Sequence, residues 1–345
     1  MHMADALLSP AVGTTLWTGS AAVAAWASRK LKRQIDEGLI PLMGVLGAFI
    51  FAAQMINFTI PGTGSSGHLG GGMILAILLG PPAAFLVMAS VLTVQALFFA
   101  DGGLLALGCN LWNLGFYPCC LVYPLLYKPI VGRSRSPVRI FAASVLGSLV
   151  ALQLGAFSVV LETLASGISE LPFAAFLWLM QPIHLAIGVV EGVVTGGIVL
   201  YILGTRPEIV EGVTASRPVA PGRPLRKALI ALGVMTLVTG GVLSWFASTL
   251  PDGLEWSIER ITGSAELVQA EGGITRTLRE LQEKTAFLPD YSFKAGGDGK
   301  AEAAPAWPAI ETGTSAAGLI GSGIVLGIVG LIGFGIRTLR RRSHT

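Results

Sequence analysis

The stretch GMILAILLGPPAAFLVMASVLTVQALFF, residues 72–99, decides how this chain folds. It holds 28 residues without a charge, and a helix of about 20 apolar residues is long enough to cross a membrane. Gly80, Pro81 and Pro82 interrupt it, and proline inside a helix removes a backbone hydrogen bond and clashes with the preceding turn. We therefore expect two segments here, the first of them too short for a full crossing.

The composition of the whole chain is that of an integral membrane protein. Of its 345 residues 52% are hydrophobic and only 12% are charged, against about 25% charged in soluble domains. The first twenty residues have no basic n-region and no small-residue cleavage site, so we expect no signal peptide. The three cysteines lie in apolar runs at no ligand spacing and are expected to be reduced thiols. Nothing in the charge balance points to a nucleic-acid partner.

Charge sets the topology of the predicted spans. Further apolar stretches of spanning length lie at 10–28, 40–60, 104–127, 140–165, 173–203, 228–249 and 314–336. Four clusters, at 29–33, 128–139, 206–227 and 337–342, hold 17 of the 23 Lys and Arg residues, which marks them as cytoplasmic. The number of crossings between these clusters then gives nine segments, with the N-terminus outside and the C-terminus in the cytoplasm.

The expected fold class is therefore an all-α membrane protein with two units. The first unit, residues 1–204, is a seven-segment helical bundle. A proline-containing cytoplasmic linker, residues 205–227, joins it to the second unit, residues 228–345. The second unit has two further transmembrane helices that flank an extracytoplasmic segment, residues 250–312. We read the chain as a fusion of two proteins.

The N-terminal peptide suggests a metal site. A histidine at position 2 keeps Met1 in place, so the Met1 amine, the His2 amide and the near ring nitrogen of His2 can close a five- and a six-membered chelate ring. Square-planar nitrogen coordination suits Ni(II) or Cu(II). His68, in the glycine-rich loop 61–71, falls on the same outer side and would supply a fourth nitrogen. The alternatives are that His2 is incidental and that His68 is a solvated loop residue.

Polar side chains at membrane depth are costly and mark functional sites. The candidates are Gln95, Asn110, Asn113, Gln181, His184 and Glu191. His184 and Glu191 are two helical turns apart and share one helix face. They either orient His2 or His68 or form a structural pair. Asp5 is expected to bind the N-terminal peptide through a hydrogen bond, and Asp101 to cap a turn.

Several short motifs, in order, resemble the CbiM/NikM family of substrate-specificity components of energy-coupling factor transporters. They are the opening MHMADALLSP, GHLGGG at 67–72, Gln95 through ADGG at 100–103, ALGCN at 106–110, and His184 with EGVVT at 191–195. PDGLEW at 251–256 resembles the small CbiN/NikN partner, known as the PDGLE domain. The resemblance implies a seven-segment bundle that binds Ni(II) or Co(II) through Met1, His2 and His68. We expect Asp5, Gln95, Asn110, His184 and Glu191 to surround these ligands.

The function expected from the resemblance is metal capture at the outer face of a bacterial plasma membrane, with nickel favoured by geometry. We expect a metal-capture subunit and not an enzyme. The chain has no P-loop motif, so we expect separate ATPase subunits to supply the energy. The family implies two ATPase subunits and a transmembrane coupling protein, whose contact we place at the small surface of Ala21 and Ala25. The alternatives are a stand-alone secondary metal transporter and a membrane metal sensor.

Overall fold

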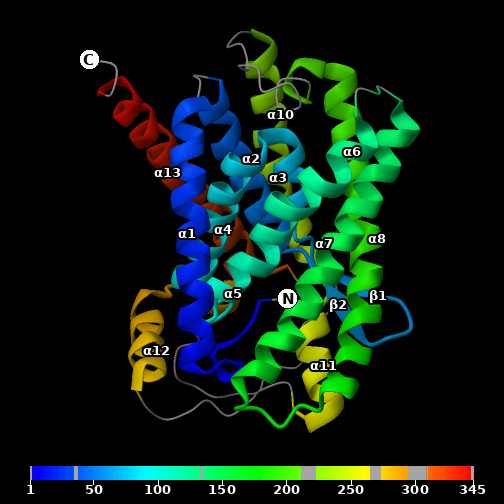
Figure 1. The fold of residues 1–345 in the computed structure, drawn as a ribbon, viewed down its shortest axis with the longest axis vertical. Coiled ribbons are helices and arrows are strands. Elements are labelled where there is room, and N and C mark those ends of the chain that lie inside the picture. Colours follow the sequence, from blue (N-terminus) through cyan, green and yellow to red (C-terminus); the bar gives the residue numbers. More distant parts are fainter. Residues whose placement is uncertain are drawn as a thin grey trace.

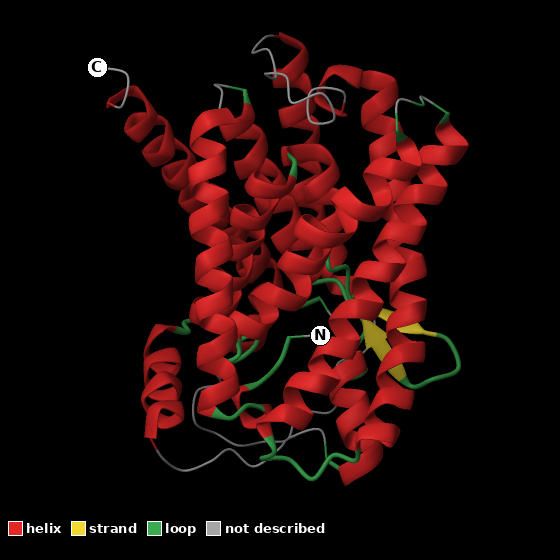
Figure 2. Ribbon diagram, viewed as in Figure 1, coloured by secondary structure: helices red, strands yellow, loops and turns green. Residues whose placement is uncertain are grey.

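The structure is a computed structural model that describes residues 2–34, 38–132, 134, 136–210, 223–264, 273–293, 308 and 310–342. These residues are largely helical (Figure 2). Long helices run side by side along the longest axis of the molecule (Figure 1), and the described residues contain one two-stranded sheet. The chain is an all-helical membrane protein.

The first unit consists of one long bundle with short helices at its ends. Its helices are η1 (Asp5–Leu7), α1 (Pro10–Gln34), α2 (Leu39–Gln54), α3 (Gly72–Leu79), α4 (Pro81–Phe99), α5 (Leu107–Leu111), the π-helix η2 (Trp112–Tyr127), α6 (Lys128–Val131), α7 (Pro137–Ser166) and α8 (Phe173–Thr205). Among the described residues five helical stretches are long and apolar enough to cross a membrane: α4, the continuous run Leu107–Val131, α7, α8 and α13 (Thr312–Arg342).

The interrupted stretch at 72–99 breaks where its prolines predict. Helix α3 has 8 residues and ends before Gly80, whose φ of 78° lies in the left-handed region. Pro81 then starts α4, a position where its missing N–H costs no helical hydrogen bond. Because eight helical residues rise only about 12 Å, α3 cannot cross the membrane alone. All residues of α3 are buried.

The predicted span at 40–60 is wrong after residue 54. Helix α2 ends at Gln54, and strand β1 (Phe58–Ile60) pairs antiparallel with β2 (Ser65–Gly67). The turn between the strands contains Gly62 and Gly64, both with positive φ, which a tight turn requires and glycine adopts without strain. Residues 55–60 read MINFTI, with only Asn57 and Thr59 polar, so mean hydropathy alone could not reveal the change from helix to strand.

The second unit packs its two long helices against α2. Helices α10 (Arg223–Gly241) and α13 approach closely where Gly240 faces Gly318, since a Cβ on Gly318 would lie 2.4 Å from the Gly240 carbonyl oxygen. Ser322 of α13 donates a hydrogen bond to the Ala48 carbonyl at 3.1 Å. The short helices η3 (Leu243–Phe246), α11 (Gly253–Thr262), α12 (Gly273–Thr285) and η4 (Pro289–Tyr291) connect them.

The motif at 251–255 begins helix α11. The Asp252 carboxylate accepts hydrogen bonds from the Leu254 and Glu255 amides at 2.8 and 2.9 Å, and Glu255 accepts one from the Asp252 amide at 3.1 Å. This reciprocal arrangement is a capping box. The adjoining Pro251 carbonyl accepts from the Ser66 amide at 2.8 Å, so the same motif also extends the β-hairpin.

The two ends of the molecule carry different elements. Helices α1, α6, α8 and α13, each with basic residues at or next to its last turn, end at the top of Figure 1. The hairpin, α11 and α12 lie at the bottom, and the start of the chain lies between the helices in the lower half. Helices α11 and α12, which belong to the segment expected to be extracytoplasmic, thus lie at the end opposite to these basic residues.

Candidate metal site

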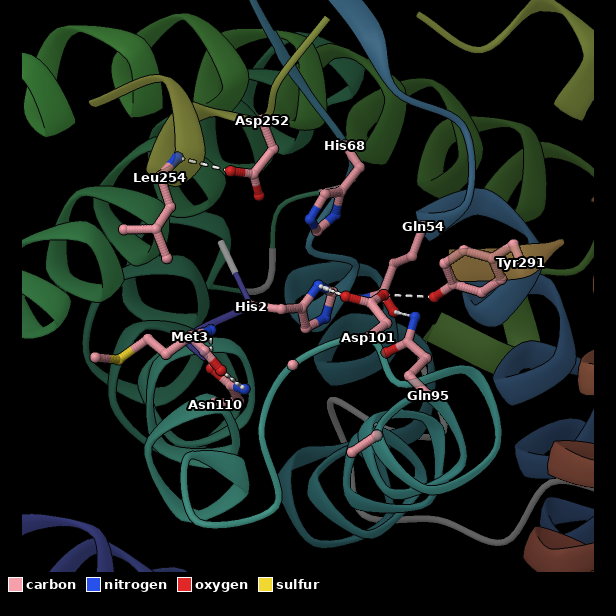
Figure 3. A network of polar contacts seen from close by, with 12 residues as sticks. His2, Met3, Gln54, His68, Gln95, Asp101, Asn110, Asp252, Leu254 and Tyr291 are labelled. Atoms are coloured by element: carbon pink, nitrogen blue, oxygen red, sulfur yellow. Dashed lines mark hydrogen bonds and ion pairs between the residues drawn. The ribbon is translucent and has the colours of Figure 1, made fainter. Parts of the chain in front are cut away.

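The N-terminal peptide enters the protein interior. Met3 is fully buried, and Leu7 and Leu8 are nearly so. The Met3 amide donates a hydrogen bond to Asn110 Oδ1 at 2.8 Å, and the Met3 carbonyl accepts one from the Gly103 amide at 2.9 Å. The peptide is therefore fixed by its own backbone, which leaves the side chain of His2 to reach into the site (Figure 3).

Asp5 does not make the contact that we expected. Its carboxylate accepts a hydrogen bond from the Ala106 amide at 2.9 Å, at the start of α5, where backbone N–H groups favour a negative charge. Asn110 binds the N-terminal peptide instead. The sequence could not distinguish Asp5 from Asn110 as the partner, because only the fold shows which side chain faces the Met3 backbone.

His2 and His68 lie side by side. Their rings stack with centroids 5.0 Å apart and planes 8° from parallel. His68 Nδ1 lies 3.0 Å from the Leu69 carbonyl oxygen; since a carbonyl can only accept, Nδ1 carries the proton and the lone pair is on Nε2. Burial lowers the pKa of His68 to about 3. His68 is therefore a neutral ligand at physiological pH.

His2 is turned towards a carboxylate. Its Nδ1 lies 3.2 Å from Asp101 Oδ1, while its buried Nε2 has no hydrogen-bond partner. The expected chelate uses Nδ1, so the ring must turn about its Cβ–Cγ bond to close it. Burial alone would raise the pKa of Asp101, but the adjacent His2 and the hydrogen bonds from His2 and Tyr291 hold it below its usual value. Met1, the remaining expected ligand, lies outside the described residues.

The loop that carries His68 is held from three helices. Glu191 of α8 accepts hydrogen bonds from the Gly70 and Gly71 amides at 2.7 and 3.2 Å. Gln54 of α2 donates to the Gly70 carbonyl at 2.8 Å, and Gln95 of α4 donates to Gln54 at 2.9 Å. These polar residues at membrane depth therefore fix the backbone next to His68.

His184 and Glu191 have separate partners. His184 Nδ1 lies 2.8 Å from the Met180 carbonyl of its own helix, and its buried Nε2 has no hydrogen-bond partner. His184 lines a small cavity together with His68 and Asp252. The arrangement thus favours two local roles over a single His184–Glu191 pair.

Three residues around the site were missed or given a minor role from the sequence. Gln54 lies within a predicted span, as Gln95 does, but was passed over. Asp101 was expected only to cap a turn, and Tyr291 belongs to the other unit. The Tyr291 hydroxyl donates a hydrogen bond to Asp101 Oδ2. Asp101 was the strongest missed signal, because it is an acidic residue between two apolar segments.

The described residues contain no group of three or more His, Cys, Asp and Glu side chains placed to hold a metal ion. A metal at this position would therefore need backbone nitrogen in addition to the two imidazoles. Ala21 and Ala25, expected to contact a partner protein, are exposed on α1, so neither is used for packing inside the protein.

Comparison with known proteins covers both units. Residues 2–209 match the family model of the cobalt uptake substrate-specific transmembrane region, CbiM, and residues 226–338 match the PDGLE domain. The chain is 32% identical to the fused nickel transport protein NikMN of Rhodobacter capsulatus, over 99% of this chain and 100% of that protein. It is 28% identical to the cobalt transport protein CbiM of Sorangium cellulosum, over 64% of this chain and 99% of that protein.

A solved structure has a similar fold over more than half of this chain. The crystal structure of a truncated transition metal transporter aligns with a TM-score of 0.52 and 29% identity, over 59% of this chain and 99% of that one. The protein therefore belongs to the CbiM family, with its transmembrane region fused to a PDGLE domain, and it is a non-catalytic, multi-pass membrane component of nickel or cobalt uptake.

Proposed function

We propose that this protein is the substrate-specificity subunit of an ATP-driven energy-coupling factor importer. It captures Ni(II) or Co(II) at the outer face of a bacterial plasma membrane through Met1, His2 and His68. The observation that carries the proposal is the buried N-terminal peptide, which brings His2 to a stacked position against His68. Nickel is favoured over cobalt because a set built from backbone and imidazole nitrogen suits square-planar coordination.

The proposal includes the two-unit organisation and its orientation. Residues 1–204 bind the metal, residues 205–227 are a cytoplasmic linker, and residues 228–345 carry the extracytoplasmic segment. The common position of the basic helix ends supports a cytoplasmic C-terminus and an outer N-terminus. The coupling protein and two ATPase subunits supply the energy, and the exposed Ala21–Ala25 surface is the proposed contact. Co-purification of both ATPase subunits with the wild-type chain, lost on Ala21→Leu with Ala25→Leu, tests this part.

The experiment that tests the metal site is an N-terminal extension. Adding three residues before Met1 moves the free amine away from His2 and should abolish retention of nickel while insertion into the membrane is unchanged. The matched control adds the same three residues after Thr345, which leaves the Met1 amine unchanged. Equal nickel content of the two extended proteins after purification would refute the chelate.

A further inference from the structure

The second unit binds a loop of the first unit, next to His2, through hydrogen bonds. This loop, residues 100–103, follows α4 and contains Asp101. Gln282 of α12 donates hydrogen bonds to the Gly102 carbonyl at 2.7 Å and to the Ala96 carbonyl at 2.9 Å. The Leu288 amide donates to the Phe98 carbonyl at 3.3 Å. Contacts to main-chain groups on both sides of Asp101 fix where that residue lies.

Tyr291 adds a contact to the side chain of Asp101 itself. Its ring stacks on Phe99, with centroids 5.2 Å apart and an angle of 20° between the planes. Its hydroxyl donates to Asp101 Oδ2, while Asp101 Oδ1 faces His2 Nδ1 at 3.2 Å. One carboxylate thus joins a tyrosine of the second unit to a proposed ligand of the first, as Figure 3 shows.

The backbone around Tyr291 is strained. Asp290 and Tyr291 have φ values of 49° and 59°, a left-handed conformation that is unfavourable for residues with a side chain. Such strain persists only where the surroundings impose it, and it concentrates at functional sites. Here the turn places the tyrosine ring against Phe99 and Phe51, from where its hydroxyl reaches Asp101.

We propose that Tyr291 is a positioning residue for the metal site, acting through Asp101 on His2. The inference rests on the proposed function and deepens it. When His2 Nδ1 binds the metal, the ring proton has to be on Nε2, and the ring has to turn about Cβ–Cγ. A carboxylate that accepts a hydrogen bond from the outer nitrogen of a metal-bound histidine fixes its tautomer and orientation. Tyr291 holds Asp101 in place for that role.

The two ends of the extracytoplasmic segment then support different histidines. Its first part, Pro251 and Asp252, extends the β-hairpin through Ser66 and so supports the strand that leads to His68. Its last part, Gln282 to Tyr291, supports His2. The second unit then contributes no ligand of its own, but it fixes both histidines.

A double-mutant cycle on the full chain tests this inference. Nickel affinity is measured by competition with a chromogenic chelator for the wild type, Tyr291→Phe, Asp101→Asn and the double variant. Phenylalanine keeps the stacked ring and removes only the hydroxyl. We expect Tyr291→Phe to weaken nickel binding by about tenfold and Asp101→Asn by about 10–100-fold. The double variant should match Asp101→Asn within about twofold, because both act through one route.

Two further measurements exclude a general effect on folding. The absorption bands of bound Ni(II) should be the same in Tyr291→Phe and the wild type, since the ligands are unchanged. Tyr201→Phe is the matched control: this tyrosine is 63% exposed on α8, near the cytoplasmic end, and the variant should bind like the wild type. Asp101→Ala replaces Asp101→Asn in the cycle if the asparagine variant does not fold.

Each outcome of these nickel-binding measurements either supports or overturns the role of Tyr291. A wild-type chain that binds no nickel overturns the proposed function and this inference together. If the wild type binds nickel and Tyr291→Phe binds it equally well, only the inference falls. It also falls if the effect of Tyr291→Phe is undiminished in the Asp101→Asn background, because the tyrosine then acts by another route. A weakened Tyr291→Phe with unchanged absorption bands and no added effect in the double variant supports it.

Discussion

Single residues of the site differ in what they offer a metal. His68 presents Nε2, because its Nδ1 is bound to the Leu69 carbonyl, and its loop is held by Glu191. His184 is nearby and its Nδ1 is likewise bound, to the Met180 carbonyl of its own helix, but the ring that stacks on His2 is that of His68. This difference sets an order of importance that mutagenesis can check.

We expect His68→Ala to weaken nickel binding by more than about 100-fold, since a residue that only orients a ligand usually contributes about 10–100-fold. His184→Ala should fall within that smaller range. Nickel affinities of the two purified variants, measured in parallel, test the order. Equal losses would mean that the roles assigned to the two histidines are wrong.

The pH dependence of binding follows from which groups carry protons. With a pKa of about 3, His68 stays neutral in the folded protein as the pH falls from 8 to 5, so it takes up no proton that competes with the metal. The amine and the amide of the chelate must each release a proton. Nickel affinity should therefore fall by about 10–100-fold for each pH unit below 8. A dissociation constant that instead changes only around pH 6.5 would indicate that an ordinary histidine controls binding.

At the scale of elements, the loop 100–103 depends on backbone that only glycine provides. Gly102 has a φ of 79°, and a Cβ there would lie 2.9 Å from Asn110 Nδ2 and 3.3 Å from His2 Cβ. Gly62 has a φ of 77° and nothing within 4 Å of its Cβ position. Both alanine variants carry a left-handed strain of about 1–2 kcal/mol, but only Gly102→Ala also displaces the residues that hold the N-terminal peptide.

We expect Gly102→Ala to weaken nickel binding by about tenfold or more, in the range of a lost orienting contact, and Gly62→Ala to leave it unchanged. Affinity and thermal stability in detergent should be measured for both. A similar loss of affinity in Gly62→Ala would attribute the effect to strain alone.

Elements differ in how far the sequence predicts them. The break at Gly80 could be predicted, because proline acts on the backbone locally. The β-hairpin could not, since residues 55–60 are mostly apolar, like α2, with only Asn57 and Thr59 polar. The pairing of 58–60 with 65–67 depends on contacts made after folding. The same reason limits what can be predicted of the site. His2 and His68 are recognisable by residue type. Tyr291 and Asp101 are 190 positions apart, and only the packing of the two units brings them together.

On the scale of the whole molecule, the second unit supports the site without completing it. The expected ligands Met1, His2 and His68 all belong to the first unit, while Ser66 and Asp101 receive contacts from the second. Removing the second unit would expose the face of α2 that packs on α13. In a bilayer this face would meet lipid tails as apolar as the lost helix, so the first unit should still fold.

A protein that ends at Thr205 should therefore keep one bound nickel after purification. Its affinity should be lower by about 10–100-fold, as for loss of orienting contacts, because both histidines lose their support from the second unit. Uptake in cells that also make the ATPase and coupling subunits should be strongly slowed, since the histidines are then no longer held ready for loading. Metal content and uptake are measured against the full chain. A truncated protein that inserts and folds but holds no metal would show that the second unit completes the site, whereas uptake equal to that of the full chain would reduce the second unit to a passive extracytoplasmic cap.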